Sequence, residues 1–202
     1  MPILPLQPVR AALTAAAVCI AFSVTIARAE PVPLPTIDYE ANAKISDAAE
    51  MLIRHSKGRV RVEFSIPGTN QPIIGIADLN TKKMVMIAKI SGLDQINAFE
   101  IDFGEDLGLG QVVGEGRRVG TSTAGGEACT LWEITAKTGK ATACIGADNI
   151  LLKTEAEIAG QQQAVFEVTK VNRRPQNPAD FEVPAGVNVV RLPKGLKIPG
   201  MQ

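Results

Sequence analysis

The chain has 202 residues, of which 46% are hydrophobic and 21% are charged, and its 21 basic residues balance its 21 acidic residues. This composition excludes a disordered polypeptide and gives no electrostatic reason to bind nucleic acid. Aromatic residues make up only 4% of the chain, and there is a single histidine. These scarcities argue against most catalytic and metal-binding classes before any motif is considered.

Residues 1–29 contain the three parts of a secretory signal: a short basic region ending at Arg10, an apolar stretch over 11–26, and Ala27-Arg-Ala29 as a cleavage box. The apolar stretch is shorter than the roughly 20 residues that a membrane helix needs. Cys19 lies inside it, but the preceding Val18 and the apolar residues that follow are atypical of a lipidation site. We therefore expect cleavage after Ala29 and a periplasmic or secreted protein; an uncleaved anchor is the alternative.

Cleavage would remove two arginines and no acidic residue, leaving 19 bases against 21 acids and a formal charge of −2. Residues 30–35 are rich in proline and predict an extended lead-in, so the domain is expected to begin near Thr36. Over residues 40–55 the pattern favours a helix, because apolar residues recur at helical spacing and most residues there are good helix formers.

From Arg59 onward the apolar residues recur with a period of two, which predicts half-buried antiparallel strands. The expected strands are 59–64, 73–77, 83–90, 98–103, 111–113, 117–121, 128–135, 140–147, 149–158, 164–171 and 181–184. Their short separations leave no room for the helices of βαβ units. We predict a single, mainly β domain over residues 36–192, with at most one or two short helices and a flexible tail over residues 193–202.

Residues 104–126 contain eight glycines, which predicts a mobile loop or bulged strands. The run 108–114 superficially resembles a nucleotide-binding loop, but its spacing is wrong and no helix follows it. Asp102, Glu105 and Asp106 gather carboxylates beside glycines and could hold a weak calcium ion. They lack the alternating ligands of a calcium loop, so a solvated acidic turn is the preferred interpretation.

Cys129 and Cys144 are the cysteines that remain after processing, and an oxidising compartment favours a disulfide between them. A two-residue turn at 138–139 would place Cys129 four residues, or roughly 13 Å, from the position opposite Cys144, beyond the approximately 7 Å that a disulfide tolerates. A four-residue loop over 136–139 reduces the offset to two residues, and one or two bulges could remove it. We predict a disulfide with an irregular strand beside it, and free cysteines if no bulge exists. A redox site usually needs cysteines closer in sequence.

No catalytic centre is predicted. A triad would need His55 as its base, and the chain has no G-x-S-x-G nucleophile elbow. Zinc would need three or four nitrogen or sulfur ligands, which one histidine and a bonded cysteine pair cannot supply. His55 lies between Arg54 and Lys57 and is interpreted as an exposed basic residue. We therefore expect no catalytic residue, no metal and no cofactor.

Trp132 alternates with Thr130 and Ile134 on one face of its expected strand, and Met84 and Met86 share one face of theirs. Core packing is the simplest interpretation of these large side chains. The alternative is that Trp132, Met84 and Met86 line an apolar concavity for a lipid-like ligand, because such side chains adapt to irregular shapes.

Three segments resemble exported bacterial proteins of a domain-of-unknown-function family, in which a Gly-x-x-Cys-x-x-Trp strand precedes a Cys-x-x-Asp-Gly-like strand and Phe-x-Val-Pro ends the domain. The segments are Cys129-Thr-Leu-Trp132-Glu133, Thr142-Ala-Cys144-Ile-Gly-Ala-Asp148-Asn-Ile-Leu-Leu-Lys153 and Phe181-Glu-Val-Pro184-Ala-Gly186. Asn149 stands where the pattern usually has glycine, and asparagine also tolerates the left-handed conformation.

Over residues 36–190 the chain is distantly similar to the lipoprotein-carrier (LolA/LolB-like) superfamily. This resemblance implies a strongly curved antiparallel sheet that forms an open half-barrel, with helices over an apolar cavity. It also implies that residues 38–56 form two strands, so helix and strand both stay open for residues 40–55.

Two functions follow from these observations. The first is a non-catalytic exported protein that binds a hydrophobic or lipid-like ligand, or a lipoprotein, in the periplasm. The second is a structural or protein-interaction module of the cell envelope with a filled core and no ligand. An empty apolar cavity of several hundred Å³ would favour the first, and a solid core the second.

Overall fold

The computed structural model describes residues 29–45, 49–65, 72–89, 96–102, 114–136, 139–158 and 160–191. Within these ranges the chain forms one thirteen-stranded sheet and one short 3-10 helix, η1 (Pro178–Phe181). The strands are β1 (Glu30–Pro31), β2 (Tyr39–Ile45), β3 (Ala49–Ser56), β4 (Arg59–Ser65), β5 (Ile73–Asp78), β6 (Lys83–Lys89), β7 (Ile96–Asp102), β8 (Glu115–Ala124), β9 (Glu127–Ala136), β10 (Gly139–Gly146), β11 (Leu151–Ile158), β12 (Gln161–Asn172) and β13 (Val189–Arg191).

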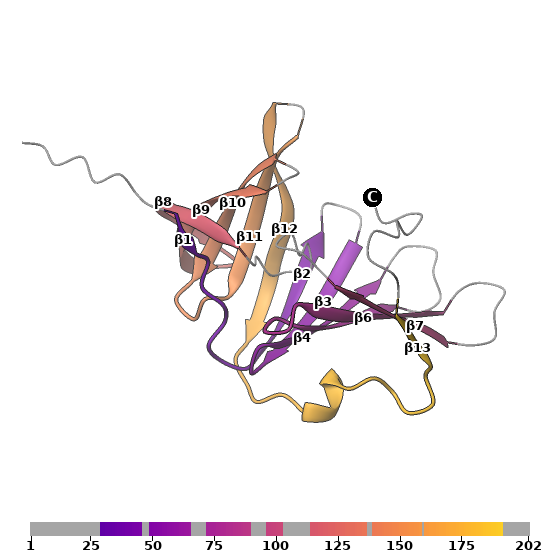
Figure 1. Cartoon of the computed structure of the whole chain (residues 1–202). Helices are drawn as coiled ribbons and strands as arrows, with labels where there is room; N and C mark the ends of the chain where they lie inside the picture. The colour runs from indigo at the N-terminus through magenta and orange to yellow at the C-terminus, as the bar shows by residue number, and fades with distance from the viewer. Residues whose placement is uncertain are drawn as a thin grey trace, which may run out of the picture.

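The strands lie in the order β1-β8-β9-β10-β11-β12-β2-β3-β4-β5-β6-β7-β13. Neighbouring strands pair antiparallel, most of them as hairpins, and β13 runs parallel to its neighbour, β7. The part of the sheet formed by β8 to β12 stands at a steep angle to the part formed by β2 to β7, so the sheet is strongly curved and open (Figure 1). The predicted mainly β architecture, a curved open half-barrel with at most one or two short helices, is confirmed.

The segment for which helix and strand were both open forms β2 and β3. Tyr39 and Ala41 of β2 are buried alternately with exposed or half-buried residues, and so are Met51, Ile53 and His55 of β3. This alternation has the period of a strand. The helix indicated by the pattern is wrong because its alanines suit either structure, and pairing with neighbouring strands decides between them.

Two hydrophobic clusters lie on opposite faces of the β2 to β7 region. The larger cluster, on the face we call the core face, draws residues from β2 to β6 and from β9 to β12. The smaller cluster contains Ile76, Ile87 and Ala98, and Val183 and Val187 pack against it. Because those valines follow η1, the second face is covered by the C-terminal part of the chain.

We call residues 173–191 the C-terminal strap. The strap leaves the end of β12, passes beneath β2 to β6, and ends as β13 beside β7 (Figure 1). The strand expected over 181–184 is absent: Phe181 ends η1, and the residues after it are irregular. Pro178 and Pro184 explain the difference, because proline cannot donate the hydrogen bonds of a strand ladder.

Candidate functional site

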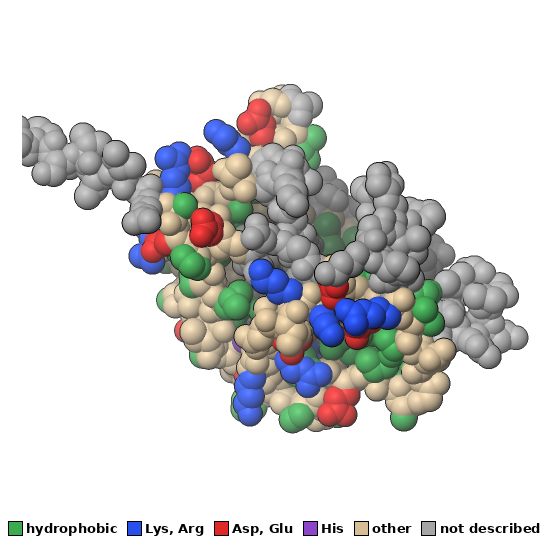
Figure 2. Space-filling model, viewed as in Figure 1, with side chains coloured by type: hydrophobic (Ala, Val, Ile, Leu, Met, Phe, Trp, Pro, Cys, Tyr) green, Lys and Arg blue, Asp and Glu red, His purple; other side chains and the backbone are tan. Residues whose placement is uncertain are grey.

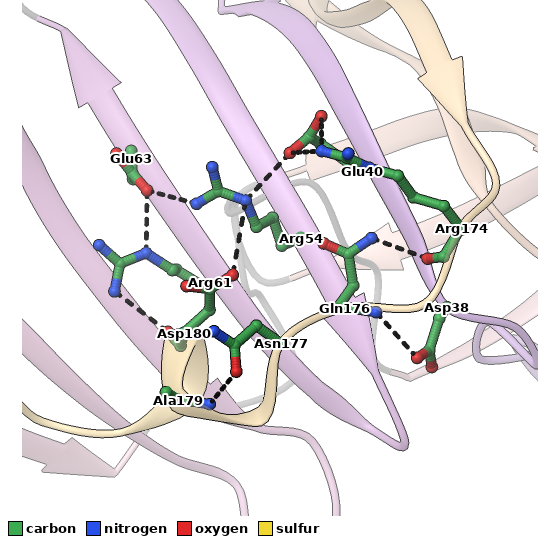
Figure 3. A network of polar contacts seen from close by, with 10 residues as sticks. All are labelled: Asp38, Glu40, Arg54, Arg61, Glu63, Arg174, Gln176, Asn177, Ala179 and Asp180. Carbon is green, nitrogen blue, oxygen red and sulfur yellow. Dashed lines mark hydrogen bonds and ion pairs between the residues drawn. The ribbon is translucent and has the colours of Figure 1, made fainter.

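The strap is fastened to the sheet by a network of charged side chains centred on Arg54 (Figure 3). Its Nε lies 3.1 Å from Glu40 Oε2 and its Nη1 lies 2.7 Å from Glu63 Oε1. Arg61 Nε also donates to Glu63 Oε1, at 2.9 Å. These residues come from β2, β3 and β4 and alternate with buried residues, so the sheet itself places them together on the face opposite the core.

Four strap residues complete the network. Arg174 Nη2 donates to Glu40 Oε1 at 3.0 Å, and the Gln176 N–H donates to Asp38 Oδ2 at 3.3 Å. Arg61 Nη1 donates to the carbonyl oxygen of Asp180 at 3.1 Å, and Arg59 donates to the carbonyl oxygen of Phe181. The strap is therefore held through its main chain as well as through its side chains.

Two carboxylates of this network, Glu40 and Glu63, are held in their charged form by the arginines. Burial acts to raise the pKa of Glu40, but hydrogen bonds from Arg54 and Arg174 outweigh it and lower that pKa. Burial acts on Glu63 in the same direction, and hydrogen bonds from Arg61 and Arg54 again lower its pKa. Neither carboxylate is suited to donate a proton near neutral pH, because a general acid needs a raised pKa. The network is built to hold the strap.

Two hollows adjoin the network on this face. The first, of about 390 Å³, is lined mainly by polar residues of β2, β3 and β4, among them Asn42, Lys44, Glu50 and Glu63. The second, of about 520 Å³, lies between the strap and β4 to β6 and is lined by residues that include Arg59, Ile76, Lys83, Val85 and Phe181. On the face shown in Figure 2, acidic and basic side chains lie close together, without a uniformly basic surface.

His55 is buried in the core, with 1% of its surface exposed, so its interpretation as an exposed basic residue is wrong. Its Nδ1 donates to the carbonyl oxygen of Ile37 at 2.8 Å, and its Nε2 accepts from the Gly58 N–H at 3.2 Å. The ring also stacks on Tyr39, with 5.5 Å between centroids. Burial lowers the pKa of His55 against the opposing effect of the Ile37 carbonyl. The imidazole is therefore neutral, and both of its nitrogens are occupied.

Cys129 and Cys144 form the predicted disulfide, with 5.4 Å between their Cα atoms. Cys144 lies opposite Leu131 and Cys129 opposite Gly146, which is the offset of two residues expected from a longer loop. The β9–β10 ladder is continuous across both cysteines, and the register shift lies on the other side of β10, between Cys144 and Ile145. No bulge between the bonded strands is needed, because diagonal neighbours on one face lie close enough to bond.

The three candidate ligand-binding side chains are all buried: the exposed fractions are 2% for Trp132, 5% for Met84 and 9% for Met86. Met84 and Met86 lie together, because a Cβ on Gly75 would be 3.6 Å and 3.4 Å from their sulfur atoms. Trp132 lies on β9, with seven strands between it and β6 in the sheet order, and the Arg118 guanidinium stacks over its ring at 5.0 Å. None of the three lines either hollow described above.

Asp102 ends β7 and lies 3.6 Å from the guanidinium of Arg191. Glu105, Asp106 and residues 108–113 lie outside the described residues, so the calcium and nucleotide-loop interpretations concern parts of the chain that the structure does not describe. Within the described ranges, no three His, Cys, Asp or Glu side chains are grouped to hold a metal ion.

In the same ranges, no helix has the length and apolar character needed to cross a membrane.

No protein-family model matches the chain, and no curated protein matches it. Among solved structures the chain is similar to PNGF-II in two crystal forms. The P21 form gives a TM-score of 0.52 at 10% identity over 78% of this chain and 32% of that one. The C2 form gives 0.51 at 10% identity over 78% and 31%.

The chain thus spans about a third of the PNGF-II structures it matches, and at this identity the likeness shows the fold alone. The chain is also distantly similar to the complex of MucA and MucB from Pseudomonas aeruginosa. That match has a TM-score of 0.45 at 15% identity and covers 81% of this chain and 62% of the other.

Proposed function

We propose that the protein is an exported, non-catalytic β module that acts through its surface, as a structural or protein-interaction component of the cell envelope. The observation that carries this proposal is the burial of Trp132, Met84 and Met86. These side chains would have to line a ligand cavity, yet they pack against neighbours in the core. A cavity that binds a lipid-like ligand is concave, apolar and several hundred Å³ in volume, whereas both hollows described above carry charged residues.

The extracytoplasmic location is supported by two independent features. Residues 1–29 have the organisation of a secretory signal. Cys129 and Cys144 are bonded in the described part of the chain, and structural disulfides persist mainly in oxidising compartments. Mass spectrometry of the protein recovered from cells tests this: the expected mature chain begins at Glu30 and carries one disulfide, and an intact Met1 terminus in the cytoplasm would contradict export.

The non-catalytic assignment is supported by how the titratable groups are used. Glu40 and Glu63 are held by arginines, with lowered pKa values. His55, the chain's only histidine, is neutral, buried and bonded through both ring nitrogens. Groups committed in this way cannot approach a substrate or change protonation state during a reaction.

Native mass spectrometry, together with organic extraction of the purified protein, separates the proposed function from lipid binding. We expect the mass of the polypeptide alone, no acyl species in the extract, and no saturable binding of a fluorescent fatty acid. Recovery of an acyl species at a fixed stoichiometry, or saturable fatty-acid binding, would instead establish the lipid-carrier hypothesis. A lipid that co-purifies without saturable binding would count as adventitious and leave the proposal standing.

A further inference from the structure

Among the described residues, the outer side of β8 is paired only at its beginning. β1 pairs with it only at Gly116 and Glu115, and the next contact is from the Val32 N–H to the Gly114 carbonyl oxygen. Among the described strands, none pairs with the outer side of residues 117–123. Side chains throughout that run are exposed, and backbone N–H and C=O groups of alternate residues are directed to the open side.

The open part of β8 is ordered against β9. A register shift between Arg118 and Gly120 leaves Val119 as the extra residue, with 50% of its surface exposed. From Gly120 to Ala124 the pairing with β9 is continuous. Among the described residues, a Cβ at Gly120 would meet only one atom within 4 Å, Leu131 Cδ1 at 3.9 Å, so the sheet face is uncrowded at this position.

The two arginines at the start of this run do not protect the edge. Arg117 Nη2 lies 2.8 Å from Glu133 Oε1, and Arg118 Nε lies 2.9 Å from Glu30 Oε1. Arg118 is also stacked over Trp132. Edge strands commonly avoid pairing through free charges or proline. Here the positive charges are balanced within the same chain, and residues 119–124 are uncharged and free of proline.

We propose that two copies of the chain associate through β8, antiparallel and with the two-fold axis at Thr121, so that the sheet continues from one copy into the other. In this register Thr121 faces the partner's Thr121, and Gly120 faces the partner's Ser122. Threonine pairs directly opposite each other are favourable on an antiparallel sheet. Arg118 faces the partner's Ala124, so no two arginines meet.

A second copy suits this edge because a two-fold contact joins identical surfaces and closes on itself. The uncharged run 119–124 is compatible with its own antiparallel image, and β1 stays in place because its pairing with β8 reaches only to Gly116. A contact made mainly by one strand from each copy lies at the small end of interface sizes. We therefore expect a weak dimer whose population rises with protein concentration.

Sedimentation velocity of the folded protein over a wide concentration range tests the proposal, with two variants at the axis. Thr121→Glu places like charges opposite each other and should return the protein to monomer. Thr121→Cys should give a covalent dimer under mild oxidation. Gln162→Glu and Gln162→Cys make the same changes at another exposed strand position, on β12, and should leave the dimer unchanged and uncaptured. Circular dichroism confirms that each variant is folded.

Three outcomes would overturn the inference: a monomer at every concentration, a dimer that Thr121→Glu does not weaken, or equal oxidative capture by Thr121→Cys and Gln162→Cys. Capture at position 121 together with dissociation by glutamate is the expected result. The inference does not rest on the proposed function, because a lipid-binding protein could pair through β8 as well. The fatty-acid binding assay therefore tests the proposed function, and sedimentation tests the dimer, so either proposal can be wrong while the other holds.

Discussion

Gly75→Ala tests whether the core face is filled beside Met84 and Met86. Gly75 lies in β5, and its φ is outside the left-handed region, so alanine fits the backbone there. The new Cβ would lie 2.9 Å from Val62 Cγ2, closer than unstrained atoms approach. Val62 is β-branched and 1% exposed, so it cannot turn away easily.

The expected destabilisation follows from two opposing effects. Adding a methyl group to a packed core typically costs about 1–3 kcal/mol. Replacing glycine by alanine within a strand returns roughly 0.5–1 kcal/mol, because glycine loses more conformational freedom on folding. We expect a net loss of about 1–2 kcal/mol, which lowers Tm by roughly 2–4 °C per kcal/mol in a protein of this size.

Urea unfolding followed by the fluorescence of Trp132 measures this loss. Gly120→Ala is the matched control, because a Cβ there meets only Leu131 Cδ1 at 3.9 Å; its stability should be equal to or slightly above that of the natural protein. If Gly75→Ala unfolds at the same urea concentration as the natural protein, with the same m-value, the core face has space for a methyl group. The core would then not be filled beside Met84 and Met86, and this result would support a ligand cavity on the core face.

Three other predictions concern stability. The free energy of unfolding should fall as the pH is lowered from about 7 to 5.5, because the unfolded chain binds a proton at His55 more readily than the folded protein, whose His55 pKa is lowered. His55→Asn should remove this dependence of the unfolding free energy on pH. An unchanged dependence in the variant would contradict a buried neutral ring. Replacing Cys129 and Cys144 by alanine should cost about 2–4 kcal/mol, given the sequence separation of 15 residues, and equal urea midpoints would refute it. Arg54→Met should cost about 2 kcal/mol, because Glu40 and Glu63 each lose one of their two arginine partners while they stay half-buried. It should also speed proteolysis within the strap, and resistance equal to that of the natural protein would mean that the network does not fasten the strap.

Much of the sheet could be predicted because alternating burial is written directly in the sequence. The expected strand 59–64 is β4, and Val60 and Val62 are buried as their alternation requires. The left-handed conformation that was allowed for Asn149 is present, with φ of +62°. In these cases neighbouring residues alone determine the local structure, so an isolated sequence contains the necessary information.

His55 and the strap could not be predicted, because long-range contacts decide both. His55 is buried only because Ile37 and Gly58 supply main-chain partners for its ring nitrogens. The strap is held by hydrogen bonds from Arg61 to the Asp180 carbonyl oxygen across 119 positions in the sequence. A main-chain carbonyl has no residue type, so the sequence contains no signal for such a contact.

The way the strap and the lead-in cover the sheet determines which edge can pair with another strand. The edge beyond β7 is covered by β13, a three-residue strand whose Arg191 lies 3.5 Å from Glu100. Short, charged edge strands resist further pairing. At the opposite edge the lead-in covers β8 only to Gly116 and leaves the longer, uncharged part exposed. Within the described ranges, residues 117–123 of β8 therefore keep backbone pairing groups available on one side, and variants there should alter association without altering stability.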